Sequence, residues 1–145
     1  MCEVAVHIRL NLPENAATKF AIRTVLREAI NKSKKNYKGN KNRKNCFYIS
    51  QYAQEVLDKN EQIKLIADHA IPVSLALRGF EKIVDLQTDS VIKLVSKYST
   101  MALITRIEDA RLRELGLVKN MPENWDGVDI FARYKVAGIK IVPYN

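Results

Sequence analysis

The chain has 145 residues, a formal net charge of +8 and 47% apolar residues, which predicts one domain with an ordinary hydrophobic core and excludes disordered, collagen-like and coiled-coil chains. Its two cysteines, Cys2 and Cys46, exclude a disulfide framework and a Cys-X-X-Cys zinc or redox site. No apolar run approaches the ~18 residues of a membrane span and no signal-peptide pattern is present, so we expect a cytoplasmic protein without a membrane partner.

The first third of the chain predicts a strand followed by a helix. Residues 3–10 alternate between apolar and polar side chains, which indicates a strand. Pro13 and Glu14 then mark a helix start. The apolar residues that follow recur at helical spacing and predict one buried face: Ile22, Val25, Leu26, Ala29 and Ile30.

The next segments alternate between expected helices and short strands. Ser50 is expected to cap a helix that ends near Asp58. The inward side chains of this helix would be Tyr52, Ala53, Val56 and Leu57. The stretch 63–71 fits either a helix or a short strand ending near His69, and Pro72 disfavours helical geometry just before it. Helices are then expected over 74–80 and after a cap at Thr88.

The C-terminal third begins with an expected buried strand over 101–105. Thr105 and Glu108 have the spacing of a capping box, and Gly116 is placed to end that helix. The inward residues of the helix would be Ile107, Leu112 and Leu115. A turn-rich stretch precedes a last helix over 128–137, capped by Asp126 and stopped by Gly138, and 139–142 closes as a strand. The whole pattern predicts an α+β fold, mostly helical with short strands.

Positive charge is concentrated in the segment 31–46, which we expect to be an exposed basic arm or loop. Seven basic residues stand there without an acidic one: Lys32, Lys34, Lys35, Lys38, Lys41, Arg43 and Lys44. The asparagines between them cannot build a core. Clustered cations followed by Phe47 and Tyr48 are typical of phosphate contact, so we expect nucleic acid as the partner, DNA rather than RNA. A solubilising loop and a surface for an acidic protein are the alternatives.

The segment around the second histidine carries a possible chemical motif. It reads Asp68-His69-Ala70-Ile71-Pro72-Val73-Ser74. Asp-His-x-x-Pro-x-Ser resembles the first motif of the HNH (ββα-metal) nucleases. The resemblance implies that Asp68 binds one divalent metal ion and that His69 is the general base acting on the attacking water. Adjacent residues on an extended backbone point to opposite sides, so one could face the metal and the other the water.

A second segment, 103–112, resembles the strand-turn-helix that ends the family motif. In the family a His or Asn of the helix is the second metal ligand, and Asp109 stands at that position. A two-carboxylate site would suit Mg²⁺ or Mn²⁺ better than Zn²⁺. Arg106 and Arg111 lie close by in sequence and could clamp a phosphate. If the resemblance does not hold, Asp68 would serve a turn, His69 would be an ordinary surface histidine and Asp109 would favour a helix N-terminus.

Two departures from the family pattern are visible. No Asn or His occurs between Ala70 and Glu108, so the residue that orients the general base in the family is absent. His69 and Asp109 are 40 positions apart, which requires a helical pair over 74–98 inserted between the two strands.

The sequence therefore predicts an HNH-like endonuclease that hydrolyses phosphodiesters with one divalent metal, possessing a divergent ββα-metal core. Two alternatives stay open: a non-catalytic module that binds DNA or RNA, and a small inhibitor or antitoxin that binds an acidic partner. The oligomeric state is left open, with a homodimer as one option.

Overall fold

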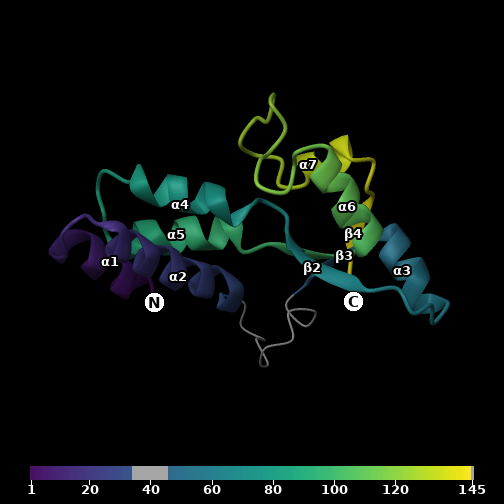
Figure 1. Ribbon diagram of the computed structural model, residues 1–145, viewed down its shortest axis with the longest axis horizontal. Coiled ribbons are helices and arrows are strands. Elements are labelled where there is room, and N and C mark those ends of the chain that lie inside the picture. The colour runs from purple at the N-terminus through teal and green to yellow at the C-terminus, as the bar shows by residue number, and fades with distance from the viewer. Residues whose placement is uncertain (34–45, 145) are drawn as a thin grey trace.

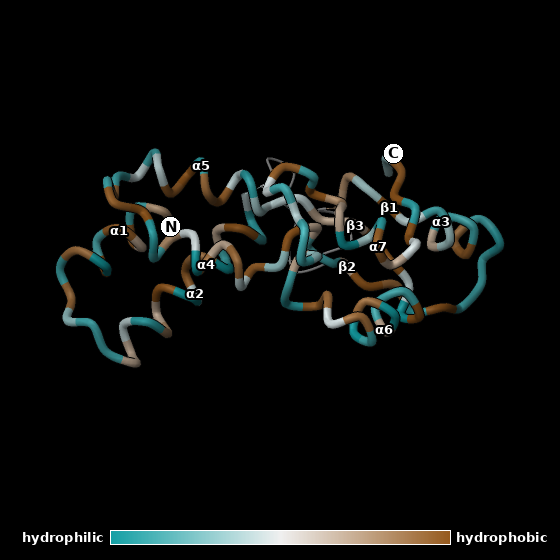
Figure 2. Tube along the Cα trace, turned by 90° about the horizontal axis from the view of Figure 1, so that it is seen from above, coloured by the Kyte–Doolittle hydropathy of each residue, from teal (hydrophilic) through white to brown (hydrophobic). Residues whose placement is uncertain are grey.

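The computed structural model describes residues 1–33 and 46–144, and in this part the chain forms seven helices and a four-stranded sheet (Figure 1). The expected α+β fold is confirmed. Helices α1, α2, α4 and α5 form one end of the molecule, whereas the sheet and helices α3, α6 and α7 form the other (Figures 1 and 2). In Figure 2 the turn between α3 and β2 is hydrophilic and lies at the extreme end of the sheet half. A single domain for the whole chain stays a prediction.

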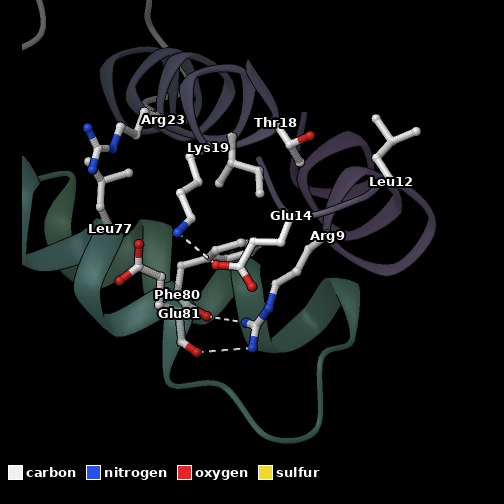
Figure 3. Close-up of a pocket in the computed structure, with 10 residues that line it drawn as sticks. Arg9, Leu12, Glu14, Thr18, Lys19, Arg23, Leu77, Phe80 and Glu81 are labelled. Carbon is white, nitrogen blue, oxygen red and sulfur yellow. Dashed lines mark hydrogen bonds and ion pairs between the residues drawn. The ribbon is translucent and has the colours of Figure 1, made fainter. Parts of the chain in front are cut away.

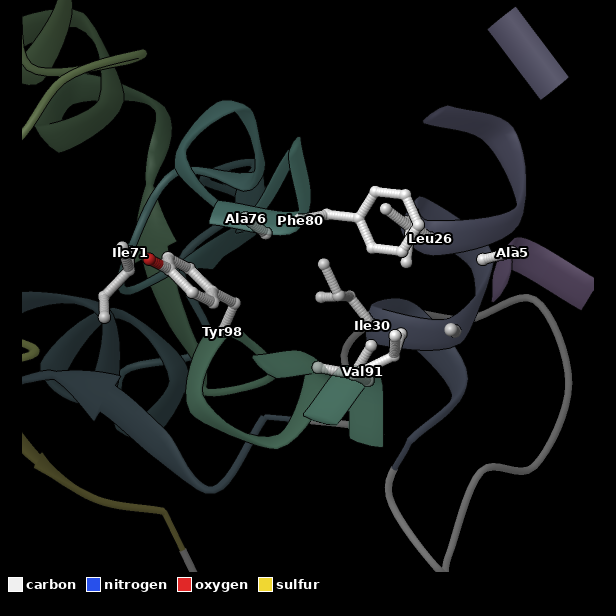
Figure 4. Close-up of a cluster of buried hydrophobic side chains, with 10 residues drawn as sticks. Ala5, Leu26, Ile30, Ile71, Ala76, Phe80, Val91 and Tyr98 are labelled. Atoms are coloured by element: carbon white, nitrogen blue, oxygen red, sulfur yellow. The ribbon is translucent and has the colours of Figure 1, made fainter. Parts of the chain in front are cut away.

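The helical end consists of two helix pairs. These are α1 (Cys2–Asn11), α2 (Ala16–Lys32), α4 (Val73–Glu81) and α5 (Thr88–Tyr98). Asn15 caps α2, since its side chain accepts a hydrogen bond of 2.9 Å from the backbone N–H of Thr18. Leu26, Ile30 and Phe80 meet in the middle of the four helices and are almost fully buried (Figure 4). The expected apolar face of α2 is thereby confirmed.

The expected strand over 3–10 is wrong, because these residues form α1. The segment also has one helical face, formed by Cys2, Ala5, Val6 and Arg9. Helix α1 packs with this face against α2 and α5. Ala5 is fully buried in that contact. The apolar residues of so short a segment fit the two-residue period of a strand and also the 3.6-residue period of a helix. Tertiary packing therefore decides between the two structures.

The sheet has the strand order β2-β3-β1-β4. Its strands are β1 (Tyr48–Ser50), β2 (Leu65–His69), β3 (Met101–Thr105) and β4 (Ile141–Pro143). Strand β2 runs antiparallel to β3, β1 runs parallel to β3, and β4 runs antiparallel to β1. The ambiguous stretch 63–71 thus contains a strand that ends at His69. The buried strand 101–105 is confirmed, and β1 is an element that the sequence did not predict.

Each face of the sheet has its own hydrophobic cluster. On one face Ala102 and Ile104 pack against Leu112 of α6 (Arg106–Glu114) and Tyr134 of α7 (Ala132–Val136). On the other face Ile49, Leu65, Met101 and Leu103 pack with Ala53 of α3 (Gln51–Asp58). The helical pair expected between the two strands is confirmed, since α4 and α5 connect β2 to β3, and α6 follows β3 directly. A ββα-metal core stays a prediction.

Several local signals are confirmed. Ser50 caps α3 by accepting a 3.0 Å hydrogen bond from the N–H of Ala53, and Thr105 and Glu108 form the capping box of α6. Gly116 follows α6 with a φ of 70° and Gly138 follows α7 with a φ of 67°, a left-handed conformation that favours glycine.

Other local expectations are wrong. Tyr52, Ile107 and Leu115 were expected to face inward but are 40%, 60% and 49% exposed, because the sheet half buries only a narrow stripe of α3 and α6. Thr88 is the first residue of α5 rather than its cap, which is Gln87.

The last helix is shorter than expected and is not capped by Asp126. The Asp126 carboxylate accepts hydrogen bonds from the N–H groups of Val128 and Asp129, which stabilises a turn at 126–129 instead. Within 1–33 and 46–144, no helix combines the length and the apolar character needed to cross a membrane.

Candidate functional site

A buried polar cluster joins β2 to α7 on one face of the sheet. Arg133 is 1% exposed, and its Nε and Nη1 donate to the carbonyl oxygens of Ala70 at 3.0 Å and Leu117 at 2.9 Å. Its Nη2 donates to the carbonyl of His69 and to Oδ2 of Asp68. The hydroxyl of Tyr134 donates to the same Oδ2 at 2.6 Å. The carboxylate of Asp68 is therefore already engaged by a cation and a hydroxyl.

Burial dominates the electrostatics of this cluster. It raises the pKa of Asp68, and the guanidinium of Arg133 opposes part of that rise. Burial and the charge of Asp68 hold the pKa of Tyr134 well above its ordinary value, so the phenol stays protonated and donates. The charge of Asp109 adds a smaller rise to the pKa of Asp68.

Asp68 and α6, the helix that carries Asp109, lie on the same face of the sheet. Asp109 lies on the first turns of α6, where its carboxylate pairs with Arg113 at 3.1 Å. Among the described residues, no third His, Cys, Asp or Glu joins them in a group that could hold a metal ion. With Oδ2 of Asp68 bound to Arg133 and Tyr134, this donor set does not fit a divalent cation. Metal binding by Asp68 and Asp109 stays a prediction.

His69 lies on the opposite face from Asp68. The two residues are adjacent on β2 and pair with Met101 and Ala102 of β3, whose side chains belong to different faces. The Nε2 atom of His69 is buried and has no hydrogen-bond partner in the described part of the chain. Burial first, then the charges of Arg133 and Arg27, lowers its pKa to about 4. His69 is therefore neutral at pH 7 and stands apart from the Asp68–Asp109 pair, so its role as a general base stays a prediction.

Two of the predicted phosphate-contacting residues lie on α6 and are exposed, but they do not cluster. Arg106 begins the helix, at the Thr105 end of β3, where its N–H donates to the carbonyl of Lys64. Arg111 lies over Gly138, where an added Cβ would be 3.4 Å from Nη2 of that arginine.

The basic segment joins the two halves of the molecule. Lys32 is the last residue of α2 and pairs with Glu28 at 2.9 Å. The other predicted cations lie outside the described residues: Lys34, Lys35, Lys38, Lys41, Arg43 and Lys44. Because β1 runs parallel to β3, the start of β1 lies at the end of the sheet where His69 lies. Arg27 of α2 contributes to the lowered pKa of His69, which lies at this same end of the sheet.

Sequence reasoning missed both Arg133 and Tyr134. The sequence does contain a signal, because Arg133 stands among apolar residues at 130–139. An arginine that is buried with such neighbours needs a carboxylate and carbonyl oxygens as partners.

No family model, curated protein or solved structure matches this chain significantly. The HNH resemblance therefore stays a prediction.

Proposed function

We propose that this protein binds nucleic acid through the phosphate backbone, with DNA preferred over RNA. The observation that carries the proposal is the segregation of charge. Residues 34–45 contain six of the 24 basic residues and no acidic one, which leaves 18 basic against 16 acidic residues in the rest of the chain. A net charge of about +2 outside the segment is ordinary, whereas +6 in 12 residues is a concentrated attraction for a polyanion.

The surroundings of the segment support the same function. Arg27 is exposed on α2 near one attachment point, and no ion pair neutralises it among residues 1–33 and 46–144. Neutral His69 adds no charge there. A phosphate backbone that follows the segment would therefore meet Arg27 at the end of the sheet.

Lysine contacts of this kind position a nucleic acid without selecting its sequence. We therefore propose binding that depends little on base sequence and strongly on salt. A cytoplasmic location, which the sequence predicts, would expose the protein to both DNA and RNA.

Phosphodiester hydrolysis is the leading function that the sequence predicts, and the observation in its favour is that Asp68 and α6, the helix that carries Asp109, lie on the same face of the sheet. The engagement of Asp68 by Arg133 and the separate location of His69 argue for binding without hydrolysis. We therefore restrict the proposal to binding and treat hydrolysis as an outcome of the test.

The binding test uses fluorescence anisotropy with a labelled duplex of about 20 bp and a single-stranded RNA of equal length. Replacing Lys34, Lys35, Lys41 and Lys44 by Ala should weaken duplex binding at least tenfold, because four phosphate contacts are lost. The matched control removes four exposed lysines elsewhere: Lys59, Lys93, Lys119 and Lys140. If both variants bind equally weakly, the loss comes from net charge alone and not from the segment. If the segment variant binds as well as the wild type, the segment does not contact the nucleic acid.

The hydrolysis test incubates plasmid with the protein and Mg²⁺ or Mn²⁺, beside EDTA. Nicking that requires the metal and disappears in both His69→Ala and Asp109→Ala would add the predicted activity to binding. Binding without nicking would leave a non-catalytic module. If neither DNA nor RNA binds, an acidic protein partner becomes the better proposal.

A further inference from the structure

A pocket of about 400 Å³ opens in the helical half, between the turn from α1 to α2 and the C-terminal half of α4 (Figure 3). This volume is in the range of sites that hold small organic molecules. The pocket belongs to neither the basic segment nor the Asp68 cluster.

The apolar wall of the pocket comes from three elements. Ile22 of α2 faces Leu77 and Phe80 of α4, and Leu12 lies at the end of α1. Leu12 is 49% exposed, so apolar surface is accessible at this edge of the pocket. A ligand with an apolar body would remove that surface from water.

Most of the charged groups in the wall already have partners. The guanidinium of Arg9 donates to the carbonyls of Phe80, Glu81 and Ile83 at the end of α4, and it lies 5.2 Å from the centroid of the Phe80 ring. Lys19 pairs with Glu14 at 2.7 Å (Figure 3). The pKa of Lys19 is raised by Glu14 and, to a smaller extent, by the carboxylate of Glu81.

Of the three cations in the wall, only Arg23 has neither a hydrogen bond nor an ion pair within residues 1–33 and 46–144, and the carboxylate of Glu81 is likewise without an ion pair there. Arg23 is exposed on α2 at the pocket edge above Leu77 (Figure 3). A guanidinium offers two parallel N–H donors that match the two oxygens of a carboxylate. The three cations and two carboxylates of the wall leave a net positive charge, which also favours an anion.

We propose that this pocket binds small molecules that carry one carboxylate on an apolar body. The carboxylate binds Arg23, and the apolar body lies against Ile22, Leu77 and Leu12. The ion pair with Arg23 is not sufficient for binding without the apolar contacts, because the guanidinium is exposed and an exposed ion pair contributes little free energy.

The test titrates the ¹⁵N-labelled protein with sodium octanoate and follows amide chemical shifts. Acetate supplies the carboxylate without the body, and octylammonium supplies the body with the opposite charge. We expect saturable 1:1 binding of octanoate, with shifts in α2 and α4 around the pocket, and at least tenfold weaker binding of the other two probes.

Variants then assign the contacts. Arg23→Gln should weaken octanoate binding at least tenfold and Arg23→Lys less, whereas Arg78→Gln, next to Leu77 in sequence but outside the pocket, should change it less than twofold. Leu77→Trp should fill the pocket and abolish binding, with circular dichroism confirming the fold. The proposal is overturned if octanoate does not saturate, if octylammonium binds equally well, or if Arg23→Gln and Arg78→Gln behave alike.

Discussion

At the scale of single residues, Arg133 is the most unusual feature of the molecule. Its guanidinium is buried, yet each donor direction meets an oxygen: three backbone carbonyls and the Asp68 carboxylate. A buried cation is tolerated only when it is paired and hydrogen-bonded in this way. Arg133 therefore holds α7, the end of β2 and the loop at Leu117 together.

Arg133→Met should lower the free energy of unfolding by about 3–5 kcal/mol, because Asp68 is left buried without its cation. Urea unfolding monitored by circular dichroism measures the loss. The double variant Arg133→Met/Asp68→Asn should recover part of it, and Arg111→Met on the exposed side of α6 should cost less than about 1 kcal/mol. Equal losses for Arg133→Met and Arg111→Met would contradict the structural role of the cluster.

His69 should make stability depend on pH. Its pKa is about 4 in the folded protein and about 6.5 in the unfolded chain, so the unfolded chain binds more protons between these values. The contribution of neutral His69 is complete above pH 6.5 and is lost as the pH falls through 4. We expect up to about 3 kcal/mol of acid destabilisation from this group.

Urea unfolding at intervals from pH 4 to 7.5 tests the expectation. His69→Gln should have a flatter pH profile than the wild type, since Gln does not titrate. Parallel profiles for the two proteins would show that the His69 pKa is not lowered by folding.

At the scale of elements, one glutamate connects two helices and two strands. Oε2 of Glu108 accepts hydrogen bonds from Ser50 Oγ at 2.7 Å, from Thr105 N at 2.8 Å and from Thr105 Oγ1 at 3.0 Å. Ser50 and Thr105 end the parallel strands β1 and β3 and cap α3 and α6. The two strand-to-helix turns are thus fixed by a single carboxylate.

Glu108→Ala should cost about 2–3 kcal/mol in the free energy of unfolding, because two caps lose a charged acceptor. Glu114→Ala, at the exposed end of the same helix, is the matched control and should stay within about 0.5 kcal/mol. The measurement is the thermal unfolding midpoint of each variant, which should be lower for Glu108→Ala than for Glu114→Ala. Equal midpoints for the two variants would show that Glu108 does not link the turns.

At the scale of the whole molecule, the helical half and the sheet half have separate hydrophobic clusters, and two strand–helix connections and the basic segment run between them. The charge of the segment exceeds that of everything else combined. The elements that flank the segment, α2 and β1, belong to the helical half and the sheet half respectively.

The fold class, most helices and the caps of α3 and α6 were predictable because those signals are local. The Thr105–Glu108 capping box needs only a spacing of three residues, and the apolar period of α2 is complete between Ile22 and Ile30. Helix α1 has ten residues and strand β1 has three. Neither was predictable, because segments this short do not distinguish the helical spacing of apolar residues from the alternation of a strand.

The candidate site was predictable only in part. An extended backbone at Asp68–His69 correctly places the two side chains on opposite faces. The partners of Asp68 come from residues 65 and 66 positions later in the chain, and no local pattern announces such a contact. The Asp-His motif identified Asp68, but no local pattern identified Arg133, whose charge neutralises that carboxylate.

The measurement that tests the central claim most directly is the salt dependence of duplex DNA binding. Plotting log K against log salt for the wild type should give a slope of about −6, the value for seven phosphate contacts. The variant that lacks Lys34, Lys35, Lys41 and Lys44 should have a slope of about −3. A wild-type slope near zero, or the same slope in both proteins, would contradict phosphate binding by the basic segment.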